Sequence, residues 1–165
     1  MAQIARQAGM SAGHIYHYFD GKEAIVMAFV AIRVAHIDER LDDLGRQDDP
    51  LESICAQVGA IVDAQLTAAR WNLSLEIYAE ASRNDTVATA LQAADADTRT
   101  RLAALVSAAR AARGLAADRG TVDGRIDAMQ TLFNGLSLRL VQDPGVAREA
   151  LIEACRIALR ALLLT

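Results

Sequence analysis

The stretch from Ile4 to Glu23 constrains the fold most, because its residues place two short helices one after the other. Residues 3–8 are helix formers with apolar side chains at one-face spacing. Gly9 stands where this helix must end, since glycine adopts a left-handed conformation without steric cost. Ser11 is a favourable N-cap, so the next helix is expected over about residues 11–19. The pattern predicts two helices joined by a turn of three residues.

A long third helix is expected to follow at once. Asp20 and Glu23 have the spacing of a capping box, and an apolar-periodic run continues to about residue 44. Its apolar residues form two neighbouring stripes, and so wide an apolar surface predicts contacts on two sides of the helix. The first stripe contains Ile25, Phe29, Ile32 and His36, and the second contains Val26, Val30, Ile37, Leu41 and Leu44.

The second short helix has an unusual outward face. Ile15 and Phe19 are four residues apart and are expected to point inward, which leaves Tyr and His side chains on the outside. Tyr and His can donate to phosphates and base edges, and Gly13 lets the backbone approach a duplex closely. Two helices joined by a tight turn form a helix-turn-helix, whose second helix enters the major groove. We therefore expect double-stranded operator DNA as a partner.

Residues 8–23 resemble the most recognisable stretch of the TetR family of one-component regulators. That stretch is A-G-(V/M)-S-x-G-x-(I/L)-Y-x-(Y/H)-F-x-x-K-(E/D), and the sequence fits it without gaps. The resemblance implies that one group of residues faces bases or nearby phosphates and that a second group mostly contacts the DNA backbone. The first group so implied is Ala12, Gly13, His14 and Tyr16, and the second is His17, Tyr18 and Lys22. Ser11 is also expected among the DNA-binding residues.

The sequence departs from the family at its start. Members usually carry a further, basic helix before this point, and residues 1–22 carry only Arg6 and Lys22 against Asp20, a formal charge of +1. That is a small positive charge for a DNA-binding domain. We expect that residues before Met1 are missing, and that without them DNA binding is weak and the N-terminus mobile. A gel-shift comparison with an N-terminally extended chain tests this, and equal affinity would refute it.

Composition favours an all-α chain, because 53% of the 165 residues are hydrophobic and only 2 are Pro. That length suffices for a core in one or two small domains. No apolar run reaches the ~18 residues that span a bilayer, and no signal peptide is evident, so a cytoplasmic location is expected. The net charge of −4 argues against broad, charge-driven nucleic-acid binding. Cys55 and Cys155 are most simply small core residues.

A helical body is expected after a polar break. Asp49 and Pro50 read as a helix start, so we place the domain boundary between residues 44 and 45. Residues 1–44 then form a helix-turn-helix DNA-binding domain with its connecting helix, and residues 45–165 a helical effector-binding and dimerisation domain. The helices expected in the body cover residues 51–70, 72–83, 86–113, 125–142 and 146–164, with a loop at 114–124.

The last two helices are expected to form a dimer interface. A short turn at residues 143–145 joins them, which makes them antiparallel neighbours. Surplus apolar surface on a terminal helix pair is what a symmetric dimer buries. The family resemblance implies the same homodimer, with a four-helix bundle across a two-fold axis. The residues that lie off the main stripes are Leu138, Val141, Ile152 and Leu159.

A small-molecule effector is the second expected ligand. Glu76 and Asn134 are polar residues on segments that look buried, and a buried polar group needs a partner. An effector pocket has mostly apolar walls with a few polar groups, although ordinary core packing is the alternative for each residue. The resemblance implies a pocket in this region without fixing its lining. The candidate lining residues are Trp71, Leu75, Glu76, Tyr78, Met129, Phe133 and Asn134.

We interpret the chain as an all-α, ligand-responsive DNA-binding transcriptional regulator, by default a repressor that a small-molecule effector releases from its operator. The alternative is a helical ligand-binding or oligomerisation module without effective DNA binding. An enzyme is not expected, because no nucleophile elbow, Gly-rich phosphate loop, HExxH or paired-Cys motif is present. No cofactor is expected. His14 and His17 lack further ligands at suitable spacing, so no metal is expected either.

Overall fold

The computed structural model describes residues 2–66 and 68–165, and this part of the chain consists of helices and connecting turns without a strand. The side chains of residues 3, 7, 12, 68–72 and 140 lie outside the described part. The all-α prediction is confirmed. The helices are α1 (Ala2–Gln7), α2 (Ala12–Tyr18), α3 (Lys22–Gly45), α4 (Pro50–Ala56), α5 (Val58–Gln65), α6 (Ala68–Ala81), α7 (Asp85–Ala112), α8 (Arg119–Gln142) and α9 (Arg148–Leu164).

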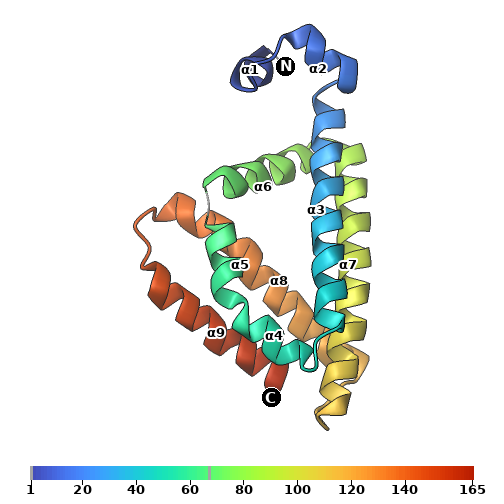
Figure 1. Ribbon diagram of the computed structural model, residues 1–165, viewed down its shortest axis with the longest axis vertical. Helices are drawn as coiled ribbons and strands as arrows, with labels where there is room; N and C mark the ends of the chain where they lie inside the picture. The colour runs from blue at the N-terminus through green and yellow to red at the C-terminus, as the bar shows by residue number, and fades with distance from the viewer. Residues whose placement is uncertain (1, 67) are drawn as a thin grey trace.

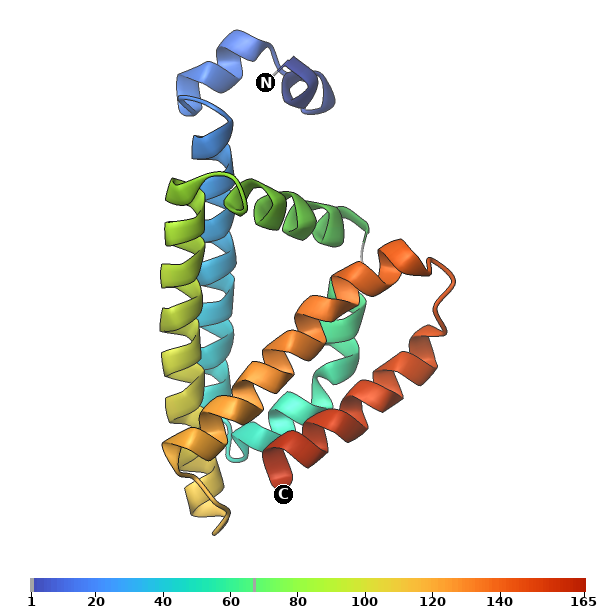
Figure 2. The ribbon, with the colours of Figure 1, turned by 180° about the vertical axis from the view of Figure 1, so that it is seen from behind.

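The helices form a small head on a larger body (Figures 1 and 2). The head consists of α1 and α2 and projects beyond the first turn of α3. In the body, α3 and α7 run side by side in the same direction, and the other helices lie to one side of this pair. α8 and α9 are antiparallel neighbours, as expected from the short turn between them.

The turn between α1 and α2 has the predicted local chemistry. Gly9 has a φ of +65°, the left-handed conformation that ends α1. The Ser11 hydroxyl caps α2 by accepting a hydrogen bond from the His14 backbone N at 3.1 Å. Ala5 and Ile15 are buried where the two helices pack together. The sequence therefore specifies this turn through local residues alone.

The predicted capping box at the start of α3 is wrong. Gly21 occupies the N-cap position, and no side chain caps the helix. Glu23 instead accepts a hydrogen bond at 2.6 Å from the Asn84 amide, at the turn between α6 and α7. Glu23 therefore contacts a residue that is distant in sequence instead of capping its own helix. The two apolar stripes of α3 are not equally buried, contrary to the prediction. Val26 and Val30 of the second stripe are buried, whereas Ile32 of the first stripe is exposed.

Several helix boundaries in the body also differ from prediction, including the start of α6, which lies at Ala68 rather than at residue 72. The helix expected over residues 51–70 is interrupted at Gln57, which lets α4 and α5 both bury apolar residues in one core. The loop expected over residues 114–124 is shorter, because α8 already begins at Arg119. Asp118 caps α8 by accepting from the Thr121 backbone N at 3.0 Å. A good N-cap outweighs the low helix propensity of Gly120 and Gly124.

The buried apolar residues form two separate clusters. The larger cluster lies where α4, α5, α7, α8 and α9 meet the end of α3, and Leu51, Val58 and Leu163 are fully buried in it. The smaller cluster joins the start of α3 to α6 and α7 through Val26 and Ile77. Leu159 belongs to the larger core and is fully buried, so its assignment to the dimer surface was wrong.

Arg110 in α7 is a fully buried charged residue. Its guanidinium donates to the backbone carbonyls of Ala116 at 2.7 Å, Leu163 at 2.7 Å and Thr165 at 2.8 Å. Burial lowers the pKa of this guanidinium from its high ordinary value. The negative end of the α9 dipole favours a cation at this position. Arg110 thereby ties the end of α9 to α7.

Candidate functional site

The exposed face of α2 consists of aromatic and imidazole side chains. Tyr16 is 52% exposed and Tyr18 is 64% exposed. The Tyr18 ring lies 5.4 Å from the His14 ring and 5.2 Å from the His17 ring, measured between centroids. A Cβ added at Gly13 would meet no atom within 4 Å, so the surface there is open. This face can stack on bases and donate hydrogen bonds, as a DNA-reading helix must.

The remaining predicted DNA-binding residues have different surroundings. Ser11 uses its hydroxyl as the cap of α2, and the side chain of Ala12 lies outside the described residues. The Lys22 ammonium lies 2.9 Å from a carboxylate oxygen of Glu80 in α6. Arg83 donates to the same oxygen at 2.7 Å. Hydrogen bonds from Lys22 and Arg83 hold the pKa of Glu80 below its usual value.

These polar contacts join the base of the head to the body. Lys22 and Glu23 begin α3, whereas Glu80 and Asn84 lie at the end of α6 and just beyond it. A movement of α6 relative to α3 must therefore stretch or break the two hydrogen bonds. The Lys22–Glu80 ion pair contributes modestly to stability, because the Lys22 side chain is half-exposed and water screens the pair in part. The ion pair matters for function because it lies between the head and the body, where it links the movements of the two.

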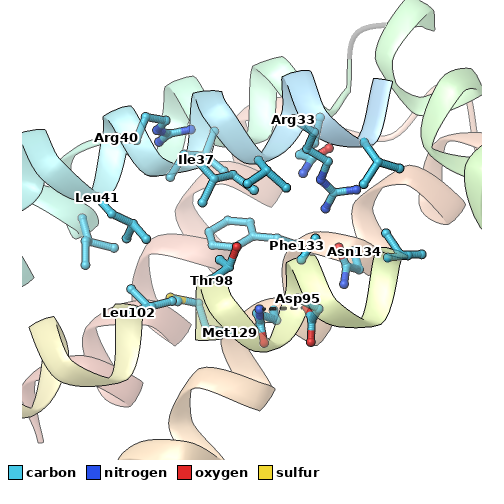
Figure 3. A pocket seen from close by; sticks show the side chains of 18 of the residues that line it. Arg33, Ile37, Arg40, Leu41, Asp95, Thr98, Leu102, Met129, Phe133 and Asn134 are labelled. Carbon is cyan, nitrogen blue, oxygen red and sulfur yellow. Dashed lines mark hydrogen bonds between the residues drawn. The ribbon is translucent and has the colours of Figure 1, made fainter. Parts of the chain in front are cut away.

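The body contains a pocket of about 510 Å³ along α3 (Figure 3). This volume is within the range of small-molecule sites. The pocket lies between the two apolar clusters, with α3 on one side and α7 and α8 on the others. α3 contributes Val30, Arg33, Val34, Ile37, Arg40, Leu41 and Leu44. The other helices contribute, among others, Gln57, Ile61, Tyr78, Leu91, Asp95, Thr98, Leu102, Met129, Gln130, Phe133 and Asn134.

The pocket brings together four of the seven residues that the sequence indicated as effector-binding. They are Tyr78, Met129, Phe133 and Asn134, and the Tyr78 hydroxyl lies 3.4 Å from the Asn134 side-chain oxygen. Leu75 and Glu76 do not line the pocket, and the Trp71 side chain lies outside the described residues. Glu76 and Asn134 are both exposed, so the premise that they are buried polar groups was wrong.

The sequence analysis missed the contribution of α3 to the pocket. Val30, Arg33, Val34, Ile37 and Arg40 recur at helical spacing and face the cavity. The available signal was the pair of arginines, which interrupts an otherwise apolar stripe at two positions seven residues apart. Arginine on a helix usually marks a solvated face, and here that face borders a pocket because α3 packs beside α7, and α8 lines the same pocket.

The described residues contain no group of three or more His, Cys, Asp or Glu side chains arranged to hold a metal ion. Within the same part of the chain, no helix is both long and apolar enough to cross a membrane. Cys55 and Cys155 are buried, and burial raises the pKa of both thiols. The candidate site therefore rests on the head and the pocket.

A helix-turn-helix head on a helical body that holds a pocket defines the class of ligand-responsive DNA-binding regulators. Residues 1–29 match the family described as bacterial regulatory proteins, tetR family. Residues 50–164 match the family described as BetI-type transcriptional repressor, C-terminal. The chain thus belongs to the TetR family, a family of transcriptional regulators rather than enzymes.

A relative with a similar sequence is the HTH-type transcriptional regulator BetI of Brucella anthropi. The two proteins are 33% identical over 89 residues, which are 51% of this chain and 45% of that protein. The chain therefore aligns with slightly less than half of that relative. No solved structure matches the chain.

Proposed function

We propose that the chain is a transcriptional repressor that binds double-stranded operator DNA through α2 and leaves it when a small-molecule effector enters the body pocket. The main support for the proposal is that α3 connects the head to the pocket. This helix begins beside the head at Lys22 and lines the pocket from Val30 to Leu44. A ligand in the pocket therefore contacts the element that positions the head. It can act only if it binds the DNA-competent and released forms with different affinity.

The DNA contacts proposed for the head follow from its exposed surface. We assign contacts with bases or nearby phosphates to His14 and Tyr16, with Gly13 and Ala12. We assign contacts with the DNA backbone to His17 and Tyr18, at the end of α2, and to Lys22, at the start of α3, where backbone amides also attract phosphate. Ser11, the N-cap of α2, is a further proposed DNA-binding residue. Lys22 already pairs with Glu80, so a phosphate would share the Lys22 ammonium with this carboxylate or replace it.

A homodimer through α8 and α9 completes the proposal. Leu138 is 54% exposed, and Val141 and Ile157 are also exposed on this helix pair, which supports burial against a second copy. A two-fold axis would present two α2 helices to half-sites about one DNA turn apart. We assign the reading of DNA to residues 1–44 and effector binding and dimerisation to residues 45–165, and we place the protein in the cytoplasm.

Substitutions within α2 should distinguish residues that contact bases from residues that contact the DNA backbone. His17→Ala and Tyr18→Ala should each weaken binding by about 5- to 10-fold on every DNA sequence, since each removes a phosphate contact. His14→Ala should instead change the preferred base at one position. Gel shifts on a panel of single-base operator variants, selected from a random pool, measure both effects.

Phe29→Ala is the control for this prediction, because Phe29 is an exposed aromatic residue on α3 outside the head. It should leave both affinity and base preference unchanged. The assignment of roles fails if Tyr18→Ala leaves binding unchanged, or if His14→Ala weakens binding equally on all operator variants.

A further inference from the structure

The pocket contains one cationic side chain without a partner among the described residues. Arg33 is half-buried and forms no hydrogen bond or ion pair there. Figure 3 shows its side chain extending from α3 toward the part of the pocket where Phe133 and Asn134 lie. A guanidinium that faces a pocket and has no protein partner keeps its donors free, so an anion bound in the pocket could accept hydrogen bonds from it.

The other charged residues of the pocket are already engaged. Arg40 donates to the neutral Gln57 side chain at 3.3 Å, and Asp95 accepts from Gln130 at 3.4 Å. Two arginines against one aspartate leave the lining with a formal charge of +1. Asp95 is exposed, whereas Arg33 is half-buried. The electrostatic balance therefore favours a ligand with a negative group near Arg33.

The remaining lining residues of the pocket determine what the uncharged part of the ligand can be. Val30, Val34 and Ile37 form an apolar face on α3, and Leu102 and Phe133 oppose it. The lining of α3 from Val30 to Leu44 corresponds to about 20 Å of helix, at 1.5 Å per residue. Such a surface suits an elongated aliphatic chain. Among the lining residues that the structure describes, Tyr78 and Phe133 alone are aromatic, and two rings are a poor basis for the aromatic cage that a quaternary ammonium prefers.

We propose that the effector is an amphipathic carboxylate, whose carboxylate is bound by Arg33 and whose aliphatic tail lies along the apolar face of α3. This inference rests on the proposed function, because it names the chemical class of the ligand for the same pocket. A guanidinium binds a carboxylate through two parallel hydrogen bonds, and such charge-assisted bonds are stronger than neutral ones. The carboxylate end would lie near the head-proximal part of the pocket, since Arg33 precedes most of the lining residues of α3.

The test compares three probes that share one tail: decanoate, decanol and decyltrimethylammonium, each below its micellar concentration. Isothermal titration calorimetry of the full chain should show that decanoate binds tightest. Arg33→Gln should weaken decanoate binding by about 10- to 100-fold and leave decanol binding unchanged. Arg46→Gln is the matched control, because Arg46 is an exposed arginine near the end of α3 that pairs with Asp43 outside the pocket. It should leave decanoate binding unchanged.

A second variant tests whether the aliphatic tail of the ligand lies in the pocket. Ala94→Phe places a ring in the pocket wall and should weaken decanoate and decanol alike. Circular dichroism of each variant verifies that the fold is retained. Tighter binding of the ammonium probe, equal loss with Arg33→Gln and Arg46→Gln, or no binding of any probe would overturn the inference.

The operator affinity of the same protein samples is measured separately by gel shift. Decanoate binding without any DNA binding would contradict the proposed function and leave the pocket assignment standing. Selective DNA binding without any probe binding would overturn the ligand assignment alone.

Discussion

Arg110→Met is expected to lower the free energy of unfolding by about 2–4 kcal/mol. The substitution keeps an unbranched side chain in the core but removes the donors to the carbonyls of Ala116, Leu163 and Thr165. The hydrogen bond to the Leu163 carbonyl is buried, so loss of that donor costs more than a lost surface contact, and relief of the buried charge offsets part of the cost. Urea unfolding at a fixed protein concentration measures the change.

Arg99→Met in the same helix is the matched control. Arg99 pairs with Asp127 at 2.8 and 2.9 Å, but its side chain is 32% exposed, so water replaces the lost contact. This variant should lose less than about 1 kcal/mol. Equal losses for the two arginines would show that the contacts of Arg110 with the end of α9 do not hold the body together.

Leu138→Asp is expected to convert the dimer into monomers and to weaken operator binding by about 100-fold or more. A two-fold interface contains the substitution twice, and two carboxylates in an apolar contact cost several kcal/mol. The subunit itself should remain folded, because Leu138 is largely exposed in the single chain. Analytical ultracentrifugation measures the oligomeric state, and gel shifts measure the affinity.

Ile32→Asp supplies the control for the interface, since Ile32 is 52% exposed on α3, away from α8 and α9. It should leave the dimer intact. Dissociation by Ile32→Asp combined with an intact dimer in Leu138→Asp would place the interface on α3 and contradict the proposed one.

The sequence predicts those features of the fold that depend on local chemistry. Gly9 ends α1, Ser11 caps α2, and Asp49 caps α4 by accepting from the Glu52 backbone N at 3.1 Å. Each of these interactions spans at most a few residues, so residue type and spacing suffice. One failure is local, since the Asp118 cap that starts α8 at Arg119 was missed, and another involves a distant partner. Glu23 contacts Asn84 instead of capping its own helix, and nothing near residue 23 indicates that choice.

The pocket was only partly predictable for the same reason. Met129, Phe133 and Tyr78 could be identified because apolar and aromatic residues on body helices are natural lining residues. Arg33 and Arg40 could not, because an arginine on an exposed helix face and one facing a cavity look alike in sequence. Their role depends on the packing of α3 beside α7 and on the residues that α8 contributes to the same pocket, which lie far away in the chain.

Selection of bound duplexes from a random DNA pool, followed by footprinting and determination of the number of subunits bound, tests the central claim most directly. The experiment uses the 165-residue chain and an N-terminally extended form in parallel. The account predicts one enriched site with two inverted half-sites, whose centres lie about one helical turn or a multiple of it apart, occupied by paired subunits. No enriched sequence with either form, or a single half-site bound equally well by one subunit, would contradict it.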